Sequence, residues 1–205
     1  MPFFSIIMQS TLKDYPGAAS DRERKLHRAI GSVINQTFQD WELIVVSDNC
    51  QRTIDISAGY ISQKVRLLGI LEDHAKWSAK CRNAGIDFSN GQYILYLDND
   101  DYFDATYLQE LYNAIQQNES LCYIVDHYER HINAWKLTRG HVAMNAAGTA
   151  NIVHSSKLKS RWPDECRYGS EDWTFIKRII AEAKHYKHLD VAGYFICHIR
   201  NKYDI

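Results

Sequence analysis

The sequence predicts an α/β protein with a Rossmann-like, mostly parallel central sheet flanked by helices. Continuous apolar runs, typical of strands buried on both faces, alternate with segments whose apolar residues recur at helical spacing. Polar residues directly follow several of these runs, as they do where the carboxyl ends of parallel strands meet at one edge of a sheet. Together these patterns favour right-handed β-α-β units.

The first half of the chain supplies the parallel part of this sheet. Short, nearly unbroken apolar runs predict buried strands over residues 3–9, 41–48, 64–71 and 92–98. Apolar residues at helical spacing predict helices over residues 26–34, 77–88 and 108–115. Gly91 is expected to end the second helix, and Asp104 is expected to be the N-cap of the third.

The alternation of buried strands with helices changes after Asn118. We predict shorter strands, compatible with antiparallel pairing, over residues 122–131, 134–140 and 148–154. A long helix over residues 169–187 and a last strand over residues 193–200 follow them. We therefore expect a single domain, residues 1–205, in which a smaller, partly antiparallel half (119–205) completes the parallel half (1–118).

Composition narrows the class of protein. A net charge of −1 provides no broad basic surface for nucleic acid. The five cysteines are widely spaced and form no C-x-x-C pair, which indicates reduced thiols in a cytoplasmic protein. No signal peptide opens the chain, and no apolar run approaches the roughly 18 residues of a membrane span. We expect a cytoplasmic protein without a membrane span, compatible with peripheral association at the inner face of the membrane.

The fourth predicted strand runs into a cluster of carboxylates, Asp98, Asp100, Asp101 and Asp104. Carboxylates this close repel one another unless a cation binds, and a D-x-D at a strand end suits Mg²⁺ or Mn²⁺. Because such ions fill their remaining positions with water and phosphate oxygens, a diphosphate is the expected partner. A solvated turn with a helix cap is the alternative. A phosphatase with an aspartate nucleophile is disfavoured, since its D-x-D-x-[TV] pattern meets Tyr102 at the fifth position.

Four segments together resemble a known family. They are "FSIIMQS", "AIGSVINQTFQDWELIVVSDN", "AKCRNAGIDFSNGQYILYLDNDDYF" and "GSEDWTFIKRI". In this order and spacing, from Phe3 to Ile180, they resemble the inverting glycosyltransferases of family 2, which have the GT-A fold. The resemblance implies a nucleotide-diphospho-sugar donor, Mn²⁺ or Mg²⁺, hexosyl transfer, and a glycan or lipid-linked acceptor.

The resemblance also implies a role for each candidate site residue. Asp172 in "SEDW" matches the catalytic base, Asp48 matches the residue that accepts a hydrogen bond from the nucleobase, and Asp100 matches the direct metal ligand. Residues 1–118 would then bind the nucleotide, and residues 119–205 the acceptor. The full set comprises nucleotide-binding Gln9, Ser10, Asp48, Arg82 and Asp98, metal-binding Asp98, Asp100 and His198, catalytic Asp172, and acceptor-binding Glu171 and Trp173.

Each assignment has a structural alternative. Arg82 would pair with a phosphate or with a neighbouring carboxylate. Acidic residues such as Asp172 are common at helix starts for the helix dipole alone. His198 is a metal ligand or a structural histidine near the chain end. The remaining paired histidines have no zinc-like spacing and are expected at the surface: His127, His131, His185 and His188.

Two departures from the family pattern concern the donor. The first loop reads "QSTL" where the family usually has a sequence close to P-T-Y-N, and "SDNC" stands where it has D-D-G-S. A UDP- or dTDP-sugar is favoured, since a carboxylate at Asp48 can accept the N3–H of uracil or thymine. A GDP-sugar stays an alternative because guanine offers its N1–H, whereas cytosine has no ring N–H there. A GT-A-like nucleotidyltransferase is the alternative enzyme, but its G-x-G-T-R-x-x-P-x-T segment is absent. A non-catalytic nucleotide-sugar-binding module is the other alternative; Asp100 and Asp172 count against it.

Overall fold

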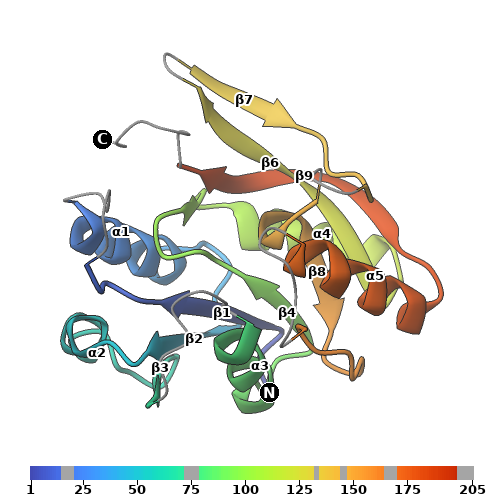
Figure 1. Cartoon of the computed structure of the whole chain (residues 1–205). Coiled ribbons are helices and arrows are strands. Elements are labelled where there is room, and N and C mark those ends of the chain that lie inside the picture. The colour runs from blue at the N-terminus through green and yellow to red at the C-terminus, as the bar shows by residue number, and fades with distance from the viewer. Residues whose placement is uncertain (15–20, 72–78, 132–133, 144–146, 164–169, 198–205) are drawn as a thin grey trace.

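The computed structural model describes residues 1–14, 21–71, 79–131, 134–143, 147–163 and 170–197. Nine strands of the described chain form one sheet in the order β3-β2-β1-β4-β8-β6-β9-β5, with β7 paired to β6 (Figure 1). The strands are β1 Phe4–Ser10, β2 Trp41–Asp48, β3 Val65–Ile70, β4 Tyr93–Tyr96, β5 Tyr102–Phe103, β6 Cys122–His131, β7 Ala134–Thr138, β8 Ile152–Ser155 and β9 Lys187–Ile196.

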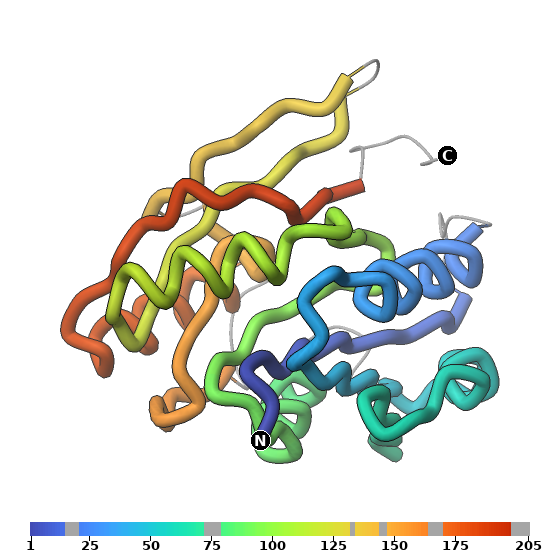
Figure 2. The backbone as a smooth tube through the Cα atoms, turned by 180° about the vertical axis from the view of Figure 1, so that it is seen from behind, coloured from blue at the N-terminus to red at the C-terminus, as the bar shows by residue number. Residues whose placement is uncertain are grey.

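Helices cover the two faces of this sheet. Apolar side chains of α1 and α4 form one core cluster with the sheet, and those of α3 and α5 form a second cluster. In Figure 2, which views the molecule from the other side, α1 and α4 lie in front of the sheet. The β6–β7 hairpin extends beyond the helices in both figures. The helices are α1 Arg22–Ile34, α2 Gln51–Ala58, α3 Ala79–Phe88, α4 Tyr107–Gln117 and α5 Glu171–Ala183, with a 3-10 turn at Thr149–Asn151.

Strand pairing confirms the predicted fold class. Strands β1 to β4 pair in parallel, whereas β8 runs antiparallel to both β4 and β6, and β7 and β5 add further antiparallel pairs. Strand β2 is buried at every position, as expected for a continuous apolar run in the middle of a covered sheet. The mostly parallel sheet with an antiparallel part in the C-terminal half is therefore present.

Several element boundaries differ from the sequence-based prediction. Helix α2 and the two-residue β5 were not predicted. The segment predicted as a strand over 148–154 begins with the 3-10 turn, and the last strand starts at Lys187 instead of residue 193. Helix α3 ends at Phe88, as its apolar spacing predicted, and so stops before Gly91, the residue expected to end it. Its predicted start at Trp77 lies outside the described residues.

The predicted N-cap of α4 was wrong by two residues. The helix begins at Tyr107, and its N-cap position is Thr106. Asp104 Oδ1 instead accepts hydrogen bonds from the N–H of Thr106, at 3.0 Å, and from its hydroxyl, at 2.9 Å. Asp104 thus stabilises the turn that precedes the helix, a local alternative that aspartate side chains commonly adopt.

Four of the five cysteines are buried free thiols: Cys50, Cys81, Cys122 and Cys197. Cys166 lies outside the residues that the structure describes. None of the helices in the described ranges combines the length and the apolar character needed to cross a membrane.

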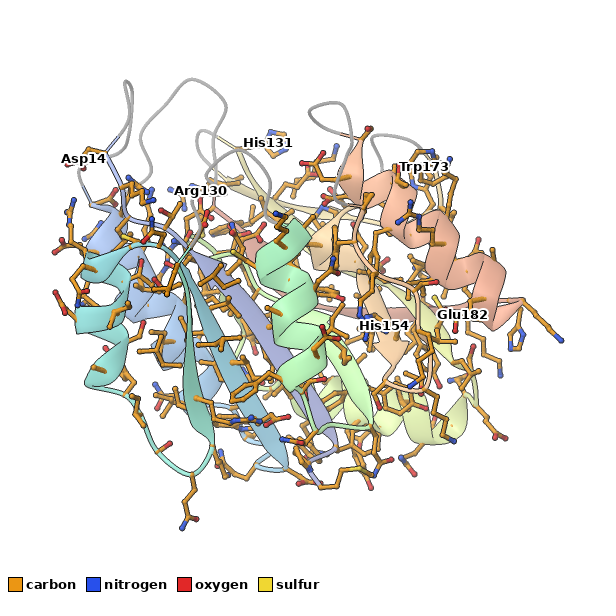
Figure 3. The ribbon with its side chains drawn as sticks, turned by 60° about the horizontal axis from the view of Figure 1, so that its bottom comes forward. Asp14, Arg130, His131, His154, Trp173 and Glu182 are labelled. Carbon is orange, nitrogen blue, oxygen red and sulfur yellow. The ribbon has the colours of Figure 1, made fainter. Side chains whose placement is uncertain are left out.

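A fully buried histidine holds two elements of the second core cluster together. His154 on β8 lies between Tyr96 and Phe175, and Figure 3 shows it inside the molecule. Its Nδ1 donates to the carbonyl oxygen of Ser155 at 3.2 Å, so its Nε2 accepts the Tyr96 hydroxyl at 2.9 Å. Because burial disfavours the charged ring, the pKa of His154 falls from 6.5 to about 4.

His154 should make the protein less stable in mild acid. Between pH 6.5 and 4 an unfolded chain protonates this histidine while the folded chain does not. The free energy of unfolding should therefore fall as pH is lowered through this range, by up to about 3 kcal/mol from this residue. Urea unfolding of the parent and of His154→Phe at several pH values measures the effect. The variant should have a shallower pH dependence in this range, and an unchanged slope would contradict the assignment.

Candidate active site

The carboxyl ends of the parallel strands bring the predicted polar residues to one edge of the sheet. Ser10 ends β1, Asp48 ends β2, and Asp98 follows β4. Next to this edge lies a cavity of about 470 Å³. Its described lining comprises Asp98, Asp100, Asp101, His127, Glu129, Ala147, Gly148, Thr149, Ala150, Asn151, Asp172, Trp173 and Ile196.

A buried arginine joins the two acidic sides of the cavity. Arg82 Nη2 lies 3.1 Å from Asp98 Oδ1, and its Nη1 lies 3.7 Å from Asp172 Oδ1. The guanidinium also stacks over the Trp162 ring, with Cζ 4.5 Å from the ring centroid. A buried charge needs such partners because it has lost its water. Of the two roles considered for Arg82, the structure displays the carboxylate pairing; a phosphate contact stays a prediction.

Asp172 lies in the first turn of α5, where its predicted role as a base requires an accessible carboxylate. Its side chain is 37% exposed and borders the cavity. Burial raises its pKa, as do the charges of Asp98 and Glu171, whereas Arg82 and the N–H of Thr149 lower it; the net shift is upward. A raised pKa makes this carboxylate a better proton acceptor than an ordinary aspartate.

The loop around Asp172 leaves little space. A Cβ atom on Gly148 would lie 3.2 Å from Asp172 Oδ2. Thr149 donates its hydroxyl to Asp98 Oδ2 at 3.2 Å, and its backbone N–H lowers the pKa of the Asp172 carboxyl. The segment before β8 therefore touches both carboxylates that Arg82 joins.

The neighbouring aspartates of the cluster have different environments. Asp101 is buried: its Oδ1 accepts the N–H of Cys197 at 2.8 Å and its Oδ2 accepts the Tyr194 hydroxyl at 2.9 Å. Asp100 is partly exposed in the cavity lining, and its backbone oxygen accepts a hydrogen bond from Arg28. Asp98 and Asp100 thus offer hard oxygen donors that fit a divalent cation, whereas Asp101 stabilises the fold.

The other predicted nucleotide-binding residues lie at the same edge but outside the described cavity lining. Ser10 Oγ accepts the Asn99 side-chain amide at 2.9 Å and lies 3.2 Å from Thr53 Oγ1. Gln9 is half-buried on β1. Asp48 is 1% exposed beside Cys81, and burial together with this carboxylate raises the pKa of the Cys81 thiol to about 12.

The two predicted acceptor-binding residues, Trp173 and Glu171, have different environments at the start of α5. Trp173 lines the cavity, and Figure 3 shows it at the N-terminal end of the helix. Lys177 Nζ lies 5.4 Å from the Trp173 ring centroid. Glu171 is half-buried outside the described lining, and its Oε2 has no hydrogen-bond partner among the described residues. The predicted metal ligand His198 lies outside the residues that the structure describes.

A polar network on the cavity wall was not predicted from the sequence. Asn151 Oδ1 accepts the Gly148 N–H, which fixes the amide so that Nδ2 donates to His127 Nδ1 at 2.8 Å. His127 Nε2 therefore carries the proton and donates to Glu129 Oε1 at 3.1 Å. The expectation of a surface position was wrong for His127, which is 3% exposed. Once β6 is known, the two-residue period of a strand places His127 and Glu129 on one face.

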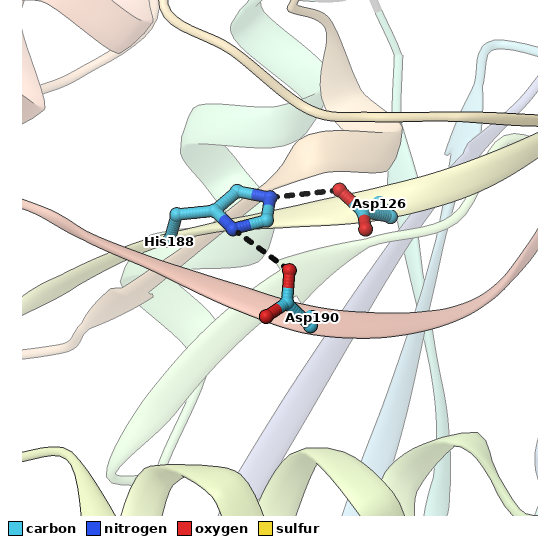
Figure 4. Close-up of side chains that lie close together, drawn as sticks. All are labelled: Asp126, His188 and Asp190. Carbon is cyan, nitrogen blue, oxygen red and sulfur yellow. Dashed lines mark hydrogen bonds and ion pairs between the residues drawn. The ribbon is translucent and has the colours of Figure 1, made fainter.

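A second histidine–carboxylate cluster lies outside this cavity lining. His188 is half-buried: its Nε2 lies 2.8 Å from Asp126 Oδ1 and its Nδ1 lies 3.4 Å from Asp190 Oδ1 (Figure 4). The three residues could contact one ion. Asp126 Oδ1 also accepts the N–H of Gly140 at 2.9 Å, and the two carboxylates meet opposite ring nitrogens. We interpret the cluster as a polar side-chain link between β6 and β9.

The fold and the sequence both define the class of protein. Staphylococcus aureus TarS 1–349 in complex with UDP-GlcNAc superposes with a TM-score of 0.79 at 17% identity, covering 98% of this chain and 60% of that one. The architecture is therefore the GT-A fold of glycosyltransferases. A family model, "Glycosyl transferase family 2", matches residues 19–183. The chain belongs to this family, which confirms the resemblance.

Curated relatives match about half of the chain. The poly(ribitol-phosphate) β-N-acetylglucosaminyltransferase TarP of Staphylococcus aureus is 35% identical over 101 residues, 47% of this chain and 30% of TarP. The Escherichia coli enzyme WfgD, a UDP-Glc:α-D-GlcNAc-diphosphoundecaprenol β-1,3-glucosyltransferase, is 27% identical over 108 residues, 52% of this chain and 42% of WfgD. The chain matches less than half the length of these two relatives.

Proposed function

We propose that the chain is a metal-dependent inverting glycosyltransferase that moves a hexose from a UDP- or dTDP-sugar to a hydroxyl group of its acceptor. One observation carries this proposal. Asp172, a partly exposed carboxylate with a raised pKa, lies in the same cavity as the predicted metal ligands Asp98 and Asp100. A proton acceptor on one side and a cation-binding D-x-D on the other are the two groups that a single displacement at a sugar carbon requires.

Asp98 and Asp100 would hold Mn²⁺ or Mg²⁺, because both present carboxylate oxygens to the cavity. When bound, the ion neutralises charge on the departing diphosphate. Arg82 keeps Asp98 in place through its 3.1 Å contact, and Thr149 holds the other oxygen of the same carboxylate. The protein thus orients this carboxylate before any ligand arrives, which lowers the cost of assembling the site.

Asp172 would take the proton from the acceptor hydroxyl as this oxygen attacks the anomeric carbon. Arg82 and the Thr149 N–H orient its carboxylate, while burial keeps it basic. In one displacement the new bond forms opposite the leaving diphosphate, so the anomeric configuration inverts. Glu171 and Trp173 would contact the acceptor at the start of α5.

The relatives suggest the class of acceptor. TarP is named for poly(ribitol-phosphate), and WfgD for a sugar on diphosphoundecaprenol. We propose a saccharide, lipid-linked saccharide or glycoprotein glycan for this chain, with peripheral membrane association where the acceptor is lipid-linked. Residues 1–118 would bind the donor, and residues 119–205 would supply the base and the acceptor side of this single domain.

Release of nucleoside diphosphate from UDP- and dTDP-sugars tests the proposal. With Mn²⁺ present, release should rise when acceptor is added, and EDTA should abolish it. A nucleotidyltransferase would instead form nucleotide-sugar from a sugar phosphate, and a binding module would bind the nucleotide without releasing it. Metal-independent release, or none with any donor and acceptor tried, would contradict the proposed function.

The nucleobase preference should depend on Asp48. Its carboxylate can accept the N3–H of uracil or thymine, whereas cytosine has no ring N–H there, so UDP and dTDP should bind more tightly than CDP. Asp48→Ala should narrow the gap between UDP and CDP by about 1–3 kcal/mol, the cost of an unmatched buried polar group. Titration calorimetry measures both affinities. Asp55→Ala, which removes an exposed carboxylate from α2, is the matched control. Equal UDP and CDP affinities in the parent would contradict the role of Asp48.

A further inference from the structure

Four aromatic side chains form a cluster at the end of the sheet where the β6–β7 hairpin emerges. We call Tyr102, Tyr128, Trp135 and Phe195 the aromatic cluster. Phe195 on β9 stacks between Tyr128 on β6 and Tyr102 on β5, with ring centroids 4.8 and 4.9 Å away. Trp135 on β7 meets Phe195 edge-on at 4.9 Å. All four rings are partly exposed, so the cluster forms a surface and not a closed core.

Two arginines lie on this cluster. The Cζ atom of Arg28, from α1, lies 5.0 Å from the Tyr102 ring centroid, and that of Arg130 lies 5.2 Å from the Trp135 ring centroid. Burial raises the pKa of the Tyr102 phenol, and the charges of Arg28 and Arg130 both oppose this rise, so both guanidinium groups lie near the same hydroxyl. Two cations on one aromatic surface repel each other, which a bound anion would relieve.

Neither arginine has a counterion in the described part of the chain. No carboxylate there lies within ion-pairing distance of either guanidinium, and the Nε atoms of both are buried without a hydrogen-bond partner. Arg28 uses one Nη atom on the backbone oxygen of Asp100. Unsatisfied buried donors on two adjacent arginines require an explanation, and an absent anion is one that satisfies both.

The aromatic cluster lies on the face of the sheet opposite the cavity, although β6 and β9 contribute side chains to both. Arg28 contacts the backbone of Asp100, and Tyr102 follows two residues later. Tyr128 lies between His127 and Glu129, which both line the cavity, so its ring points to the other side of the same strand. A ligand chain on the cluster would therefore have to pass around β5, the last strand in the sheet order, to bring a hydroxyl to the cavity.

We propose that Arg28, Arg130 and the aromatic cluster bind a phosphate group of a phosphate-bearing acceptor, an inference that rests on the proposed function. Guanidinium groups match phosphate oxygens in pairs, and the rings would pack against the carbon faces of the adjoining sugar or polyol. A free inorganic anion would use the arginines but not the rings. The donor diphosphate is assigned to Asp98 and Asp100, so the cluster takes a different phosphate.

Arg130→Gln is the test variant, because Arg130 contacts none of the predicted metal ligands. Arg139→Gln is the matched control: it removes an arginine at the base of the same hairpin, where that side chain is 73% exposed and paired with Asp190. The probes are poly(glycerol phosphate), a polyprenyl diphosphate sugar in neutral lipid vesicles, vesicles alone, and inorganic phosphate. Binding is followed by Trp fluorescence, and UDP affinity is measured separately.

Arg130→Gln should weaken binding of one phosphate-bearing probe about ten- to hundredfold, the loss expected for a charge-assisted hydrogen bond. UDP affinity should stay at the parent value, and Arg139→Gln should bind like the parent. If poly(glycerol phosphate) loses affinity, the bound phosphate belongs to a polymeric phosphodiester. If the polyprenyl diphosphate sugar loses affinity, the bound phosphate belongs to a lipid diphosphate. Equal binding by parent and Arg130→Gln, an equal loss in Arg139→Gln, binding of vesicles alone, or a parallel loss of UDP affinity would each overturn the proposal.

Because binding is measured without sugar transfer, this result is separate from the proposed function. A parent that binds the phosphate polymer but releases no nucleoside diphosphate would contradict the enzyme and not the anion site. A parent that transfers sugar to neutral acceptors and binds no phosphate-bearing probe would contradict the anion site alone.

Discussion

Asp172→Asn is expected to lower the rate of sugar transfer by two or more decades while UDP and Mn²⁺ bind as in the parent. Loss of a general base typically costs about 10²–10⁴ in rate. Asparagine keeps the size of the side chain but cannot accept the proton. Arg82 retains Asp98 as its partner at 3.1 Å in this variant, so the buried guanidinium is not left without a countercharge. The effect should therefore fall on kcat and not on nucleotide affinity.

Glu171→Gln is the matched control for this prediction. It removes a carboxylate from the same helical turn, next to Asp172 but outside the described cavity lining, and it should lose much less activity. A transfer assay on both variants is paired with nucleotide titration. Near-parent transfer by Asp172→Asn would refute the catalytic assignment, and loss of nucleotide binding would mean that the residue holds the fold or the donor.

The pH profile provides an independent check on the base. Activity requires the deprotonated carboxylate, so kcat/KM should fall as pH is lowered through the pKa of Asp172. Burial raises this pKa, and the fall should begin at a higher pH than an ordinary aspartate would give. Asp172→Asn should lose this acid limb from its residual activity.

The strands that position the site were predictable because a parallel sheet is buried on both faces. The continuous apolar runs in β1, β2 and β4 are typical of strands in such a sheet. The residues that follow these strands lie at the same edge because the strands are parallel. Asp98 and Asp172 were both selected as site residues. Their connection through Arg82 was not predicted, since it joins segments 90 positions apart (82 and 172) and depends on how α3 and α5 pack against the sheet.

Polar residues whose roles depend on burial were harder to assign. His127 was expected at the surface because no ligand pattern surrounds it, but its environment is set by Asn151, which reaches it from the turn before β8. Asp104 sits where an N-cap would be expected, yet two further residues form a turn before α4 begins. In both cases the local sequence permits several hydrogen-bond partners, and tertiary packing chooses among them.

Asp100 and Asp101 are adjacent in the chain but should respond to substitution in opposite ways. Asp100→Ala is expected to abolish Mn²⁺-dependent nucleotide binding and turnover while the protein stays folded. Its side chain is partly exposed, and the contact with Arg28 uses the backbone oxygen, which alanine retains. The free energy of unfolding should change by less than about 1 kcal/mol, as for substitutions away from the core. Urea unfolding and UDP titration with and without Mn²⁺ measure the two quantities.

Asp101→Ala should instead destabilise the fold. It removes the acceptor of both the Tyr194 hydroxyl and the Cys197 N–H, and the Tyr194 oxygen in turn accepts the N–H of Asp98 at 3.0 Å. Each buried donor left unpaired costs about 1–3 kcal/mol, so the free energy of unfolding should fall by roughly 2 kcal/mol or more. The folded fraction at low temperature should still bind UDP more tightly with Mn²⁺ than without it. The assignment of Asp100 as the metal ligand would be reversed if metal-dependent UDP binding survived in Asp100→Ala and disappeared in folded Asp101→Ala. The cation would then depend on the buried carboxylate of Asp101.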